Sequence, residues 1–277
     1  MAKRQQDNSN LIFIIIVVIV IIAMGIVIYI ANNNANTSTQ SVNSLVNKDN
    51  KLANKNVLSS LFSISLPNLK NALNSNVKAT TTTPITGEPL LVKNNLPRVV
   101  YVGADYCPYC AAERWALIIA LSKFGKFSNL RYMTSSSSDV YPSTATFTFY
   151  KSSYTSKYID FTPKETNTNI SSQGGYTSLE TLTQIENNLI NKFDAYPYVT
   201  KSSAGSIPFI DIGNKGLIVG AQYSPQLLQS MNWSQIASSI ANTKSVISQN
   251  VLKSSASIIK NICKITNEKP QKVCSNI

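Results

Sequence analysis

The sequence predicts an α/β domain that follows one N-terminal transmembrane helix, and three stretches carry this prediction. Residues 99–125 read as a short buried strand, a turn with two cysteines and an apolar helix. Residues 207–220 read as two short strands joined by a tight, glycine-containing turn. Residues 11–30 are apolar or small without a break. Strands that alternate with helices typically form a sheet covered by helices.

The N-terminal apolar run has the length of a membrane span. Its twenty residues would form a helix of roughly 30 Å, which matches one hydrocarbon core. Lys3 and Arg4 precede it, and no charge follows it until Lys48. The positive-inside rule therefore places the N-terminus in the cytoplasm and the rest of the chain outside. A cleaved signal peptide and a prepilin-type assembly segment are the alternatives.

The polar chain after this run predicts a spacer. Residues 31–51 are rich in Asn, Ser and Thr, which favours a flexible and exposed chain. Residues 57–73 carry enough apolar side chains to dock as short helical pieces, although Pro67 interrupts any single helix. The predicted organisation is a cytoplasmic tail (1–10), a transmembrane helix (11–30), a spacer (31–89), a compact domain (90–250) and a C-terminal tail (251–277).

An insertion is predicted inside the compact domain, at about residues 139–200. Within it, residues 145–150 and 157–161 alternate with period two and predict a hairpin. A helical apolar stripe follows, with Glu180 and Glu186 on or near its solvent face. This stripe predicts a helix at 179–193. Outside the insertion, the sequence predicts a parallel strand at 130–133 and mostly helical chain at 224–265.

Composition excludes several classes of function. The 277 residues contain no histidine, which removes catalytic triads, Cys/His dyads and histidine metal ligands. The formal net charge is +12, but the lysines never form a run of five, so nucleic-acid binding is not expected. Charged residues make up only 14% of the chain. A surface of this kind resembles archaeal cell-surface proteins and leaves little charge to change in an acidic medium.

The two cysteines of the central stretch carry the predicted chemistry. Cys107 falls where a helix N-cap is expected, with Pro108 at the first helical position and Cys110 one turn further in. The helix N-terminus stabilises a thiolate and lowers its pKa, which favours Cys107 as nucleophile and Cys110 as resolving thiol. Such a pair is equally half of a zinc site. A four-cysteine zinc site with Cys263 and Cys274 is therefore the rival interpretation.

The order of these features resembles the thioredoxin superfamily. Residues 107–110 (Cys-Pro-Tyr-Cys) match its redox motif, and Pro208 matches the proline that this superfamily holds in the cis form beside its thiols. The longer string CPYCAAERWALIIALSKFG, with YVGADY before it and TFTFYKSSYTSKYIDF after it, is similar to an uncharacterised archaeal and actinobacterial family. That family is a domain of unknown function, sometimes labelled as thiol–disulfide isomerases. The resemblance covers about residues 90–245 and implies a thioredoxin-like fold without an established substrate.

The resemblance also implies a mechanism. Cys107 would exchange with a substrate sulfur through a mixed disulfide that Cys110 resolves. The backbone at Ile207 would hold the substrate chain as a strand does, and cis-Pro208 would keep that edge open. The alternative is that Pro208 is a trans proline at the start of a strand. The implied substrate-binding residues are Pro108, Tyr109, Ile207 and Pro208.

Two acids lie close to the thiols in the sequence. Asp105 and Glu113 are candidates for a proton relay, although neither matches the position of the buried acid of thioredoxins. The alternative is exposure to solvent, with Glu113 and Arg114 in a surface role. Trp115 is expected in the core.

The remaining cysteines and three sequons fit a location outside the cell. Cys263 and Cys274 are expected to form a structural disulfide that ties down the C-terminal tail, contributing very roughly 2 to 3 kcal/mol through loop closure. An electron relay to the other pair is the alternative. Glycosylation sequons begin at Asn36, Asn169 and Asn232.

These observations predict a membrane-anchored, extracytoplasmic thiol–disulfide oxidoreductase, of the oxidase or isomerase kind. We expect it to act on thiols and disulfides of secreted or surface proteins, with a membrane redox partner and without a cofactor. In an acidic medium an oxidant is favoured over a reductant, because ordinary thiols are protonated there. The alternative is a surface binding or assembly module that chaperones a soft metal such as Cu(I) through the two thiolates.

Overall fold

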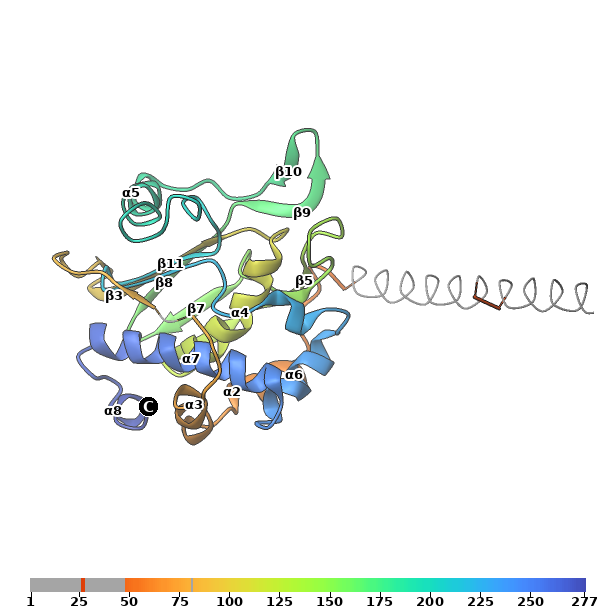
Figure 1. Ribbon diagram of the computed structural model, residues 1–277. Helices are drawn as coiled ribbons and strands as arrows, with labels where there is room; N and C mark the ends of the chain where they lie inside the picture. Colours follow the sequence, from red (N-terminus) through yellow and green to blue (C-terminus); the bar gives the residue numbers. More distant parts are fainter. Residues whose placement is uncertain (1–25, 28–47, 81) are drawn as a thin grey trace, which may run out of the picture. The chain divides into compact units, whose positions relative to one another are not determined.

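The computed structural model describes residues 26–27, 48–80 and 82–277 (Figure 1). The chain divides into two compact units, Met1–Ser44 and Leu45–Ile277, and the second contains every element discussed below. Most of the predicted span at 11–30, and the sequon at Asn36, lie outside the described residues. Among the helices that the structure does describe, none combines the length and apolar character needed to cross a membrane.

The second unit is a mixed α/β fold. Its helices are α2 (Lys55–Phe62), α3 (Leu66–Leu73), α4 (Pro108–Leu121), α5 (Gln184–Phe193), α6 (Trp233–Ala241), α7 (Val246–Ile265) and α8 (Gln271–Cys274), with a 3-10 turn η1 (Pro225–Leu228). Its strands are β1 (Thr83–Pro84), β2 (Val92–Lys93), β3 (Leu96–Gly103), β4 (Gly125–Ser128), β5 (Arg131–Thr134), β6 (Ala145–Thr148), β7 (Ser153–Ser156), β8 (Asp160–Glu165), β9 (Asn167–Ser172), β10 (Gly175–Ser178), β11 (Phe209–Ile212) and β12 (Gly216–Val219).

A central mixed sheet organises the fold around β3. The strand order is β1-β12-β11-β3-β2, and β8 pairs with β3 in parallel. Strands β11 and β12 form the hairpin predicted at residues 207–220, and β11 runs antiparallel to β3 with Phe209 opposite Val102. The β-branched and aromatic side chains of β3 are buried on both faces, as the sequence predicts. Strand β3 therefore leads directly from the core to the cysteine turn.

Two apolar clusters lie on the two faces of this sheet. Val99 and Tyr101 of β3 belong to a large cluster with α4 and α7, whereas Val100 and Val102 pack with Leu189 and Phe193 of α5. Adjacent residues of a strand point to opposite faces, which separates the two sets. Figure 1 shows α7 alongside α4, and α5 beyond the opposite side of β11. Helix α4 is covered almost completely, which explains why its sequence is apolar around most of its circumference.

The segment predicted as a spacer contributes to this core from residue 48 onward. Helices α2 and α3 bury Val57, Leu61 and Leu69 against the large cluster. Pro67 lies in the first turn of α3, a position where a helix tolerates proline. The segment therefore forms two helices, and the proline breaks neither of them. The compact unit consequently includes α2, α3 and β1 in addition to the predicted domain at 90–250.

The interior of the predicted insertion differs from expectation. Residues 157–161 do not pair with 145–150: β6 forms a hairpin with β5, and β7 pairs with β4. A strand does form near 130–133, as β5, but the prediction that it is parallel is wrong, because β5 is antiparallel to β6 and separate from the central sheet. The parallel strand is instead β8, which occupies the position beside β3. Short runs with alternating polarity fit several partners, so local pattern could not identify the pairing.

The acids assigned to the solvent face of residues 179–193 also require correction. Glu186 is buried and accepts a hydrogen bond of 2.6 Å from Arg98. It also forms a capping box with Thr183 at the start of α5. A carboxylate that satisfies a helix N-terminus and an arginine together is stable away from water. Glu180 is half-buried and accepts a hydrogen bond from the Glu165 N–H.

Candidate thiol site

The two cysteines meet at the N-terminus of α4. Cys107 is the N-cap residue, and its Sγ accepts a hydrogen bond of 3.1 Å from the backbone N–H of Cys110. Neither sulfur is in a disulfide. The exposed fraction of the residue is 4% for Cys107 and 0% for Cys110, so Cys107 is the more accessible of the two. The more accessible cysteine is thus the one for which the sequence predicts the attacking role.

The environment separates the acidities of the two thiols. Burial raises the pKa of Cys107, but hydrogen bonds from the Cys110 thiol and N–H, together with the charge of Arg114, outweigh burial and lower it. Burial raises the pKa of Cys110 well above its ordinary value, and the hydrogen bond to Cys107 adds to this effect. Cys107 therefore ionises first.

The residue pair 207–208 lies beside the outer sulfur. The Ile207–Pro208 peptide bond is cis, as the resemblance implied. The Cys107 thiol donates to the Ile207 carbonyl oxygen across 3.6 Å. Because Ile207 precedes β11 and Cys107 follows β3, two adjacent strands of the central sheet bring these residues together.

Glycine is required where β3 enters the cysteine turn. A Cβ atom at Gly103 would collide with the Tyr101 hydroxyl group and would lie 3.1 Å from Cys110 Sγ. The carbonyl oxygen of Gly103 also accepts hydrogen bonds from the N–H and hydroxyl of Thr166. The backbone thus approaches the inner thiol closely while it remains tied to the residue after β8.

Tyrosines from separate elements surround the thiols. Tyr106 precedes Cys107 and stacks on Tyr176 of β10, with ring centroids 4.1 Å apart and an interplanar angle of 4°. Tyr109 lies between the cysteines, is 41% exposed and meets the edge of Tyr141 at 5.9 Å. The β9–β10 hairpin therefore places an aromatic ring next to the cysteine turn, a contribution that the sequence pattern did not indicate.

A buried ionic cluster lies behind the cysteine turn. Arg114 of α4 donates from Nε and Nη2 to the two carboxylate oxygens of Glu165, at 2.9 Å and 2.6 Å. Its Nη2 also donates to the Ala104 carbonyl oxygen and lies 3.7 Å from Asp105 Oδ1. All three side chains are buried, so the expectation that Asp105 and Arg114 face solvent is wrong. The pairing with β8, which sequence could not predict, is what makes their burial tolerable.

Glu113 is buried on the other side of α4. Its carboxylate accepts a hydrogen bond from the Gln222 N–H at 2.9 Å and lies 3.1 Å from Ser254 Oγ. Burial raises the pKa of Glu113 to about 7 against these hydrogen bonds. The expected surface role for Glu113 is therefore wrong as well. Trp115 is buried, as predicted, and donates to the Ala145 carbonyl oxygen.

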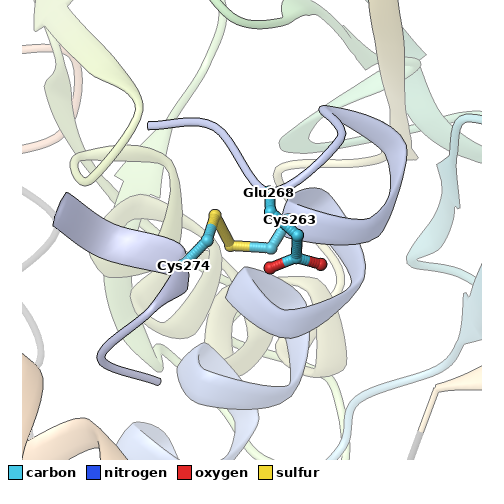
Figure 2. Close-up of side chains that lie close together, drawn as sticks. All are labelled: Cys263, Glu268 and Cys274. Carbon is cyan, nitrogen blue, oxygen red and sulfur yellow. A yellow bond between two sulfur atoms is a disulfide. The ribbon is translucent and has the colours of Figure 1, made fainter. Parts of the chain in front are cut away.

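The other cysteine pair forms the predicted disulfide. Cys263 at the end of α7 is bonded to Cys274 of α8, with Cα atoms 5.5 Å apart (Figure 2). The Glu268 carboxylate lies close to both sulfurs, giving a group with the ligand types of a metal site. Because the sulfurs are bonded to each other, they offer no thiolate pair, and the rival four-cysteine zinc site lacks two of its ligands.

The two sequons in the described residues have partly buried asparagines with structural contacts. The Asn169 amide donates to Asp49 and to the Thr134 carbonyl oxygen. Asn232 caps α6 and forms a capping box with Gln235. Attachment of a glycan at either amide nitrogen remains a prediction.

One protein-family profile matches residues 85–264, about two thirds of the chain, and its description is a domain of unknown function (DUF929). The matched region runs from the segment before β2 into the end of α7, and it contains both free cysteines and the 207–208 pair. No curated protein and no solved structure matches the chain.

Proposed function

The chain belongs to the DUF929 family, a domain of unknown function, and we propose that this domain is a thiol–disulfide oxidoreductase with a thioredoxin-like arrangement. The observation that carries the proposal is the position of Cys107. Its sulfur caps α4, accepts the Cys110 N–H at 3.1 Å and has a lowered pKa although it is mostly buried. A structural cysteine with no such donors has no reason to ionise.

The proposed reaction is a two-step exchange. The Cys107 thiolate attacks one sulfur of a substrate disulfide, forming a mixed disulfide and releasing the other substrate sulfur as a thiolate. Cys110 then loses its proton and attacks the Cys107 sulfur. This step forms a Cys107–Cys110 disulfide and releases the second substrate thiolate. The substrate is reduced by two electrons and the protein is oxidised; the reverse sequence oxidises a substrate dithiol.

The residues around Cys107 suggest how a substrate chain is held. Ile207 lies before β11 with its carbonyl oxygen beside Cys107, so an extended chain that lies along Ile207 brings its own sulfur to the nucleophile. Tyr109 is the most exposed aromatic residue of the cysteine turn and offers a flat apolar surface next to it. Pro108 and Pro208 complete the proposed substrate-binding set.

We place this activity outside the cytoplasm, on a chain anchored by residues 11–30. The Cys263–Cys274 disulfide supports this location, because structural disulfides persist mainly in oxidising compartments. The substrates proposed are secreted or surface proteins with exposed thiols or disulfides. The lowered pKa of Cys107 favours an oxidant, since a stabilised thiolate stabilises the reduced form of the protein.

The test uses a Cys110→Ser variant of the full chain. The Cys107 thiolate then forms a mixed disulfide that no internal thiol resolves, so incubation with oxidised insulin should yield a covalent adduct that dithiothreitol releases. A matched Cys107→Ser variant should form none, because Cys110 is fully buried. If Cys110→Ser forms no adduct and the parent instead binds Cu(I) through both thiols, the soft-metal alternative replaces this proposal.

A further inference from the structure

Arg114 is the cation nearest to the thiol site that is wholly enclosed by protein. It belongs to α4, one turn after Cys110, and its Nη2 donates to the Ala104 carbonyl oxygen at 2.8 Å. The same oxygen accepts the backbone N–H of Cys107. The guanidinium group therefore fixes the turn that presents Cys107. Its charge contributes to the lowered pKa of Cys107 and opposes the rise in the pKa of Cys110.

Two carboxyl groups share this single cation, and only one of them accepts hydrogen bonds from it. Glu165 accepts both hydrogen bonds from Arg114 and a third from the Phe149 N–H, and the Tyr101 hydroxyl lies 3.4 Å away. Asp105 Oδ1 is buried and, among the described residues, has no hydrogen-bond partner. Burial raises the pKa of Glu165, but the Arg114 charge and these hydrogen bonds oppose the rise, whereas the Asp105 oxygen without a donor favours the protonated form.

We propose that Arg114 is the positioning residue for the Cys107 thiolate and that Asp105 is a second counter-ion whose ionisation weakens this stabilisation. This inference rests on the proposed function for the role that it gives to the Cys107 thiolate. The charge arrangement itself does not depend on any substrate. With Asp105 neutral, the cluster of Arg114 and Glu165 has no net charge. With Asp105 ionised, the cluster carries one negative charge behind the thiols and disfavours a third anion there.

The groups that face Asp105 cause its carboxyl group to lose its proton in the neutral pH range. Burial is the largest contribution and Glu165 of β8 adds to it, whereas Arg114 opposes both, so that the pKa of Asp105 rises to about 7. Asp49, from the segment before α2, contributes a further small rise. Arg131 of β5 and Lys151 line a pocket of about 290 Å³ together with Asp105, and this pocket connects Asp105 with solvent protons.

The test is the redox equilibrium of the Cys107/Cys110 pair with glutathione at pH 5 and at pH 8, in the parent and in Asp105→Asn. In this equilibrium one glutathione disulfide and the protein dithiol exchange with two glutathione thiols and the protein disulfide. At pH 5 Asp105 is neutral in the parent, so the two proteins should give the same equilibrium constant. At pH 8 the neutral variant should favour its reduced form by about fivefold over the parent.

Matched controls separate this inference from its alternatives. Asp211→Asn removes a buried acid of similarly raised pKa on β11, which is opposite Val100 in the middle of β3 and is influenced by Arg98, and it should leave the equilibrium unchanged at both pH values. Asp105→Ser is a second neutral variant, should the first fold poorly. The inference is overturned if Asp105→Asn and the parent agree at pH 8, or if Asp211→Asn shifts equally. Failure to trap substrates would remove the proposed function without altering these outcomes.

Discussion

The Ser254 hydroxyl group lies between the Glu113 carboxyl group and the Gln222 side chain. Ser254 Oγ lies 2.7 Å from Gln222 Oε1 and 3.1 Å from Glu113 Oε1. The Gln222 Nε2 group donates to the Thr80 carbonyl oxygen, so Gln222 Oε1 is the atom that accepts from Ser254. A hydroxyl has one proton to give. Its proton is therefore shared between two acceptors, with the shorter contact to Gln222, and this leaves burial free to raise the pKa of Glu113 to about 7.

The raised pKa values of the buried carboxyl groups predict that the protein is more stable in acid than above neutral pH. The folded-state pKa values of Glu113, Asp105 and Asp211 are raised to about 7, mainly by burial. Stability from a raised carboxyl pKa is complete below the unfolded value and is lost as pH rises through the folded value. Urea unfolding should give a free energy that falls between pH 5 and pH 8, with Glu113 alone contributing on the order of 3 kcal/mol. A free energy that rises over this range would contradict the assignment.

Glu113→Gln isolates the contribution of Glu113 ionisation to this pH dependence. The amide mimics the neutral carboxyl group: its NH₂ can donate to Ser254, and its oxygen can accept from the Gln222 N–H. We expect the variant to match the parent near pH 5 and to exceed its free energy of unfolding at pH 8. Glu113→Ala is the control, because it leaves the Gln222 N–H unpaired and should destabilise the protein at both pH values.

The parts of the fold that sequence could predict are those specified by local pattern. The strand, cysteine turn and helix at 99–125 and the hairpin at 207–220 were predictable, because each encodes its own period, cap or turn. Helix α4 ends at Leu121, and β4 begins at Gly125, the last residue of this stretch. The position of β8 beside β3 was not predictable, since a parallel neighbour is selected by packing across the sheet and leaves no local signal.

The same distinction applies to the site. The cysteines and Pro208 can be recognised in the sequence from their spacing and residue type. Arg114 and Glu165 do not, because a charged residue in sequence reads as exposed until its partner is known. One signal was available: Glu113 and Arg114 are the only charged residues of a helix that is otherwise apolar around most of its circumference, which indicates that these charges are enclosed.

Gly103→Ala should disrupt the thiol site although it adds only one methyl group. The added methyl group collides with the Tyr101 hydroxyl, which is enclosed beside Glu165, and approaches Cys110 Sγ to 3.1 Å. We expect a destabilisation of about 1–3 kcal/mol. We also expect faster alkylation of Cys110 in the folded protein, because the turn must move away from α4. Gly174→Ala is the control: its Cβ meets no atom within 4 Å, although its φ of +86° adds a smaller backbone cost. Equal effects of the two variants would refute the steric explanation.

Removal of the C-terminal disulfide should lower stability without altering the thiol site. The bond closes a short loop with a sequence separation of 11, which limits the freedom of the unfolded chain. Replacement of Cys263 and Cys274 by serine should therefore cost about 2–3 kcal/mol in urea unfolding. The redox equilibrium of Cys107 and Cys110 with glutathione should be unchanged. A shift of that equilibrium would instead support the electron-relay interpretation of the second pair.

The stack of Tyr176 on Tyr106 predicts a selective effect on large substrates. Replacement of Tyr176 by alanine removes the ring that the β9–β10 hairpin holds at 4.1 Å from Tyr106 and frees Tyr106 to leave its place before Cys107. The stack contributes about 0.5–1.5 kcal/mol, so the fold should survive. We expect kcat/KM to fall several-fold for a peptide disulfide and to change little for hydroxyethyl disulfide, which needs no extended surface. Tyr176→Phe keeps the ring and should behave as the parent. Equal losses for both substrates would mean that Tyr176 supports the thiols themselves and not the surface around them.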